Sequence, residues 1–163
     1  MSFFPGSFLI ARQTLRDPSF ASTVVLLLQH NEDGALGLVL NRPLKAEGLP
    51  FQVFSGGPCQ TPGLFMLHGR PDWSDDSRVE VAPGIFVGDQ QCLERASDLP
   101  PEEVSACRVF LGYAGWGPGQ LESEIAAGAW AMTQAAANVL FETPTEDLWS
   151  RLCPPAIPQP SLN

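Results

Sequence analysis

The two histidines of the sequence are its candidates for acid–base chemistry. His30 follows an apolar run at residues 24–28, and His68 lies directly before Gly69. A histidine beside a carboxylate such as Glu122 or Glu124 can act as a general base, so either ring paired with Glu122 would suit a hydrolase or a transferase. A single histidine at the end of an apolar strand is more often a hydrogen-bonded structural residue, and this alternative stays open for both.

Asn41 and Arg42 follow a second apolar run, and with His30 they form a first candidate binding segment. If the three side chains converge, they could hold an anion or a carbonyl group. The alternative is structural, because an asparagine in a turn usually bonds the nearby backbone and an arginine can lay its stem along an apolar surface.

Gly56 and Gly57 form a second candidate segment, in the stretch SGGPCQ at residues 55–60. Adjacent glycines can expose backbone N–H groups as an anion-binding nest, but the Lys-Ser/Thr ending of a phosphate-binding loop is missing. A bend at the end of a strand is the commoner explanation of such a pair. Cys59 would act as a nucleophile only beside a base, and the sequence shows none.

The third candidate segment, GYAGWGPGQLE at residues 112–122, contains the only tyrosine and four glycines. Glycines at this density cost backbone entropy, so the segment needs a close backbone approach or positive φ angles. It leads from an apolar strand into a helix, whose N-terminus could bind an anion. A tightly packed turn in which Trp116 fills the core explains the pattern equally well.

Strands must position most of these residues. Apolar and β-branched runs predict strands at residues 8–11, 23–30, 35–41, 51–54, 64–68, 78–82, 85–88 and 108–113. The turn NEDG at 31–34 predicts a hairpin over 23–41. Helices are predicted at 90–97, from 118 to about 128, and from a capping box of Thr143 and Glu146 to about 152, while 130–134 stays ambiguous between strand and helix. Helices collected toward the end of a series of strands indicate an α+β domain.

Charge and cysteine spacing limit the cofactors and partners. Nine basic and eighteen acidic residues give a net charge of −9, which disfavours direct DNA binding. The four cysteines lack the paired spacing of a zinc site, so we expect reduced thiols, no metal and no cofactor. We read no signal peptide at the N-terminus, and no apolar run approaches the ~20 residues of a membrane helix. These features predict a cytoplasmic protein without membrane association.

Several motifs together resemble the YqgE/AlgH family of uncharacterised bacterial proteins: FLIA at 8–11, TVVLL at 23–27, GLVLNRP at 37–43, GGP at 56–58 and GYAGWGPGQLE at 112–122. The resemblance extends to residue 152. It implies a single α+β domain with a bent, largely antiparallel sheet that forms a barrel-like core flanked by helices. It supplies no mechanism. The link from 43 to 51 is shorter than usual for the family, which leaves open whether a helix there is missing.

We therefore expect an acidic domain at residues 1–152 and a flexible, proline-rich tail at 153–163. A non-catalytic regulatory or binding protein is favoured, with a site for a small ligand or a protein partner at the glycine-rich loops. The alternatives are a hydrolase or transferase that uses His68 or His30 with Glu122, and a transcriptional regulator that acts indirectly or by binding nucleic acid. The candidate site consists of His30, Asn41, Arg42, Gly56, Gly57, His68, Tyr113, Trp116, Gly117, Gln120 and Glu122.

Overall fold

A computed structural model describes residues 3–12, 15, 20–44, 52–73, 79–88, 90–98, 100 and 107–153 of the chain. The strands are β1 (Ser7–Ala11), β2 (Val24–Asn31), β3 (Gly34–Val39), β4 (Pro43–Leu44), β5 (Val53–Ser55), β6 (Cys59–His68), β7 (Val79–Ala82), β8 (Ile85–Gly88), β9 (Cys107–Trp116) and β10 (Trp130–Gln134). The helices are α1 (Gln90–Ser97), α2 (Gln120–Ala126), α3 (Ala137–Glu142) and α4 (Leu148–Leu152), with short 3-10 turns at Pro71–Trp73 and Thr145–Asp147.

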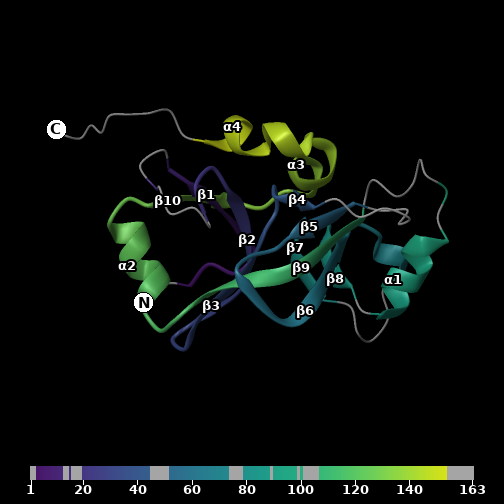
Figure 1. Cartoon of the computed structure of the whole chain (residues 1–163), viewed down its shortest axis with the longest axis horizontal. Coiled ribbons are helices and arrows are strands. Elements are labelled where there is room, and N and C mark those ends of the chain that lie inside the picture. The colour runs from purple at the N-terminus through teal and green to yellow at the C-terminus, as the bar shows by residue number, and fades with distance from the viewer. Residues whose placement is uncertain are drawn as a thin grey trace.

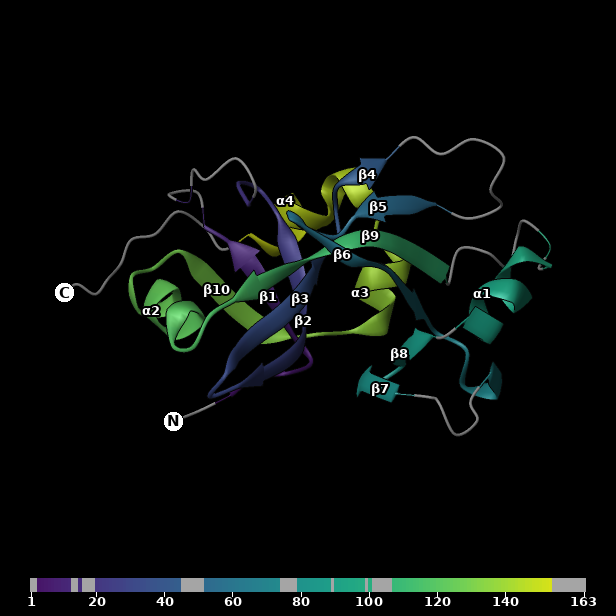
Figure 2. The same cartoon turned by 60° about the horizontal axis from the view of Figure 1, so that its bottom comes forward.

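The strands form one sheet in the order β10-β1-β2-β3-β9-β6-β8-β7. Its pairs are antiparallel except for β5, which runs parallel to β9 and also pairs with β4. The sheet curls into a nearly closed barrel, with α2 beyond one end and α1 beyond the other (Figures 1 and 2). The strands β10 and β7 are the two ends of this strand order, and their outer edges pair with no other strand that the structure describes, while β4, which lies off this order, pairs only with β5. This architecture confirms the predicted α+β fold class.

The hairpin of β2 and β3 is apolar at residues 24–27 and 37–39 because both of its faces are buried there. Val24 and Leu26 point into one core cluster, and Val25 and Leu27 point into another on the opposite face, as the two-residue period of a strand requires. The second cluster lies beneath α2 and contains Trp116 and Trp130 of β9 and β10. The sheet therefore separates these two cores, and the candidate residues of β9 divide between them: Tyr113 packs against the first, and Trp116 belongs to the second.

Most predicted elements are present, and the differences have physical causes. The ambiguous segment at 130–134 is β10, because it pairs along β1. The helix α3 was not predicted. The capping box is wrong: the Thr143 hydroxyl accepts a hydrogen bond from Arg151 at 2.7 Å, no side chain caps Thr145–Asp147, and α4 begins only at Leu148. The link at 45–51 and the tail from 154 lie outside the residues that the structure describes.

Candidate functional site

Two of the predicted site residues form a close pair. Nε2 of His30, near the end of β2, lies 3.2 Å from Oε2 of Glu122 in the first turn of α2. The His30 side chain is fully buried, and that of Glu122 is 24% exposed. Nδ1 of His30 accepts a hydrogen bond from the N–H of Phe4 at 3.0 Å. Because Nδ1 is an acceptor, the proton of the neutral ring lies on Nε2 and faces the carboxylate.

The same imidazole packs against the N-terminal segment of the described chain. The ring of Phe3 meets it edge-on with centroids 5.0 Å apart, and the ring of Phe4 lies 5.9 Å away. Nε2 of His30 and Oε2 of Glu122 lie 3.2 Å apart, and neither has an aligned hydrogen-bond partner among the described residues. His30 therefore anchors residues 3 and 4 to the hairpin.

A second polar network centres on Glu124, which the sequence analysis named only as a possible carboxylate partner of a histidine. Its Oε1 accepts hydrogen bonds from the indole N–H groups of Trp116 at 3.0 Å and Trp130 at 2.9 Å. Its Oε2 accepts one from Gln120 at 3.1 Å, and Gln120 in turn accepts the N–H of Gly117 at 3.0 Å. This network ties α2 to β9 and β10. The spacing of Gln120 and Glu124, four residues apart on a predicted helix, was the available signal.

The glycines of the second and third segments pack against each other. Gly112 has φ +80°, and a Cβ there would lie 2.8 Å from the carbonyl oxygens of Cys59 and Gly57. Gly57 has φ +151°, and a Cβ there would overlap the carbonyl of Tyr113. A Cβ on Gly56 would likewise overlap the carbonyl of Gly112. The backbone of these glycines suggested an anion-binding nest. In the structure, it is packed against other backbone segments of the protein itself.

Asn41 and Arg42 hold the segment that precedes β2. Oδ1 of Asn41 accepts the N–H of Val24 at 3.0 Å, and its Nδ2 donates to the carbonyl of Ser22 at 3.0 Å. Arg42 donates to a carbonyl in the same segment at 2.8 Å. Val24 and His30 are six residues apart on β2, which is about 20 Å of strand. Asn41 and Arg42 therefore do not converge with His30, and both bond nearby backbone instead.

His68 belongs to another part of the barrel. Its side chain is buried, its Nδ1 accepts the N–H of Arg70 at 3.1 Å, and its ring lies between those of Trp73 and Phe86 at 5.0 and 5.4 Å. It stands at the opposite end of β6 from Cys59, about 30 Å away along a ten-residue strand. The eleven candidate residues thus divide among separate neighbourhoods, and they do not line one cleft.

No group of three or more metal-ligating side chains occurs within the described ranges, and the cysteines in those ranges form no disulfide. None of the helices that the structure describes is long and apolar enough to span a membrane.

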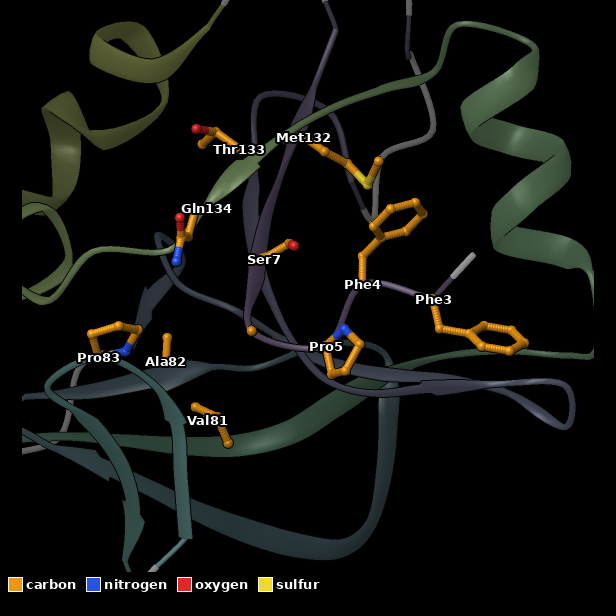
Figure 3. A pocket seen from close by; sticks show the side chains of 11 residues that line it. Phe3, Phe4, Pro5, Ser7, Val81, Ala82, Pro83, Met132, Thr133 and Gln134 are labelled. Atoms are coloured by element: carbon orange, nitrogen blue, oxygen red, sulfur yellow. The ribbon is translucent and has the colours of Figure 1, made fainter. Parts of the chain in front are cut away.

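A hollow of about 450 Å³ lies directly beside the segment that His30 anchors. We call it the N-terminal pocket; it is lined by residues 3–7, 81–83 and 132–134. Figure 3 shows the side chains of β10 on one side, those of β7 and its turn on another, and Phe3, Phe4 and Pro5 on a third. No sequence motif predicted this pocket, because residues 3–7, 81–83 and 132–134 are brought together only by the order of the strands in the sheet.

Comparison with known proteins matches almost the whole chain to one family. A family model described as AlgH-like covers residues 8–155. A UPF0301 protein of Chlorobaculum tepidum is 38% identical over 157 residues, spanning 90% of this chain and 83% of its own. The solution structure of AlgH from Pseudomonas aeruginosa superposes with a TM-score of 0.68 at 34% identity, covering 90% of this chain and 85% of that one.

A crystal structure of a Corynebacterium diphtheriae protein, DIP2367, has the same fold, with a TM-score of 0.76 at 24% identity, covering 96% of this chain and 88% of that one. The matched region includes the hairpin, the glycine contacts of β9 and the helix that carries Glu122. The chain therefore belongs to the AlgH-like (UPF0301) family of bacterial proteins, for which no biochemical activity is established.

Proposed function

We propose that this protein is a non-catalytic binding protein whose ligand or partner occupies the N-terminal pocket. The observation that carries the proposal is that one wall of the pocket, Phe3 and Phe4, is fixed by the buried His30 ring through a hydrogen bond and two aromatic contacts. Binding sites are usually concave and formed before the ligand arrives. A histidine that holds a pocket wall supports binding without taking part in a reaction.

The lining of the pocket indicates which groups it would accept. Most of its side chains are apolar, and its polar ones, Ser7, Thr133 and Gln134, are uncharged. Apolar walls with a few polar groups are typical of sites that hold an apolar group and orient it by hydrogen bonds. We therefore expect an uncharged apolar group next to an amide or a hydroxyl.

The geometry argues against the catalytic alternative. The His30 and Glu122 pair has the separation that a base and its carboxylate partner need, but the imidazole is fully buried and both of its nitrogens face protein groups. A general base must reach a proton of the substrate. His68 is also buried, with Nδ1 engaged by the backbone of Arg70.

The proposal is tested by NMR titration of ¹⁵N-labelled protein with N-acetylphenylalanine methylamide, an uncharged amide with one apolar side chain. We expect shift changes at the backbone N–H groups of residues 6–7, 81–82 and 132–134. Thr133→Trp, which fills the pocket from an exposed position, should abolish them. Leu111→Trp, at an exposed strand position outside the pocket, is the control and should bind normally. Absence of these changes, or their persistence in Thr133→Trp, would refute the proposal.

A further inference from the structure

The outer edge of β10 presents backbone groups that the barrel leaves unpaired. Arg12 donates its N–H to the carbonyl of Ala129 at 2.9 Å, and the register pairs Phe8 with Thr133. Hydrogen-bonded residues alternate along an antiparallel ladder. The N–H and C=O groups of residues 129, 131 and 133 therefore face β1, and those of Met132 and Gln134 face outward. No backbone partner for these two residues occurs on that side among the residues that the structure describes.

The outer edges of β10 and β7, at the two ends of the strand order, are not equally protected. Proteins usually guard an exposed edge with charges, prolines or bulges. The β7 edge carries the exposed Glu80, a register irregularity between Glu80 and Ala82, and Pro83 directly after the strand. The β10 edge, Trp130–Gln134, has neither a charged residue nor a proline. An unguarded edge beside a pocket is the arrangement by which sheets accept a further strand.

The hollow along this edge is elongated. A second hollow of about 430 Å³, lined by Pro83, Gln134 and residues 135–138, shares Pro83 and Gln134 with the N-terminal pocket. The two form one groove from the Phe4 wall past the end of β10. At about 3.3 Å per residue, the span from 132 to 136 matches about five extended residues. This shape suits an extended peptide better than a compact metabolite.

The charge of the protein surface indicates which peptides the groove would bind. The groove lining contains no charged side chain, but the chain carries a net charge of −9. Glu80 is exposed on the β7 side, and Glu122 is partly exposed behind the Phe4 wall. Acidic groups around a neutral groove favour an apolar segment with basic residues at its ends.

We infer that the β10 edge binds an extended segment of a partner protein, apolar at its centre and basic at its ends, by adding it as a further strand with one apolar side chain in the N-terminal pocket. This inference rests on the proposed function, because it names the partner class for the same pocket. The main chain of the segment would bond Met132 and Gln134, and its basic ends would face the acidic surface.

The test compares three synthetic peptides by isothermal titration calorimetry and NMR: acetyl-KVLVK-amide, the same peptide N-methylated at both valines, and acetyl-EVLVE-amide. A fourth peptide is N-methylated at the leucine, because the added strand can bind with the N–H groups of either its valines or its leucine toward β10. We expect the basic peptide to bind at the β10 edge, one of the two methylated forms to lose at least tenfold in affinity, and the acidic peptide to bind at least tenfold more weakly.

A pair of variants locates the bonds on the protein. Met132→Pro removes an outward N–H, which an edge strand tolerates, and should lower affinity at least tenfold, while Met132→Ala keeps the N–H and serves as its control. If Met132→Pro does not fold, the comparison of methylated and unmethylated peptides on the parent protein still tests the inference. Equal binding of all methylated forms, or a dimer of this chain through β10 that the peptide does not dissociate, would overturn the inference. If N-acetylphenylalanine methylamide still binds in the pocket, the proposed function survives that result; if it does not, both fail.

Discussion

Gly112→Ala tests whether the glycines of the third segment serve the packing of strands or an open binding surface. Gly112 has φ +80°, where a residue with a side chain is disfavoured by roughly 1–2 kcal/mol. Its new Cβ would also lie 2.8 Å from the carbonyl oxygens of Cys59 and Gly57. Both oxygens belong to the backbone, so the strands must move apart, at a cost of about 1–3 kcal/mol. We expect the free energy of unfolding to fall by about 2–5 kcal/mol.

The assay is urea denaturation followed by tryptophan fluorescence, with Gly117→Ala as the matched control. Gly117 lies in the same segment, its φ is not in the left-handed region, and a Cβ there would meet only Oε1 of Gln120 at 3.8 Å. The control should stay within about 0.5 kcal/mol of the parent protein. If Gly112→Ala is as stable as Gly117→Ala, the backbone contact is not what requires glycine, and the segment would again be a candidate for ligand contact.

Two further substitutions test the interior. Glu124→Gln removes the charge that strengthens the hydrogen bonds of Trp116 and Trp130, so the free energy of unfolding should fall by about 1–3 kcal/mol in urea denaturation; a loss below about 0.5 kcal/mol would contradict the network. Burial raises the pKa of Cys107 to about 11, so above pH 9 the unfolded thiol loses its proton while the folded one keeps it. Stability should therefore decline from pH 9 to 11, and this decline should be smaller in Cys107→Ala, whereas equal declines would refute the assignment.

The local part of the fold follows from the sequence because it depends on short-range patterns. The Asp-Gly turn and two apolar runs define the hairpin of β2 and β3, and Gln90–Ser97 forms a helix at the predicted residues. The order of the strands does not follow, because it is decided by contacts between distant segments. The pairing of β10 with β1 joins residues more than a hundred positions apart, and it creates both the free edge and the N-terminal pocket.

The candidate site likewise has features that residue types predict and features that only the folded chain creates. Residue types alone indicate that His30 and Glu122 can pair, and the structure places their polar atoms 3.2 Å apart. The contacts of Glu124 were not predicted, because they depend on two indoles from β9 and β10 that meet only in the folded barrel. A sequence shows which groups can form hydrogen bonds. Which N–H groups need an acceptor inside the protein depends on which of them the fold buries.

What His30 does is decided by its surroundings. At an open surface, an imidazole 3.2 Å from a carboxylate would be a candidate base. Here, its Nδ1 is engaged by the N–H of Phe4 and its ring is covered by Phe3 and Phe4. A substrate could reach it only by displacing the segment that forms one wall of the N-terminal pocket. Access to His30 for catalysis would thus dismantle the pocket, so a reaction at His30 and binding in the N-terminal pocket exclude each other in this fold.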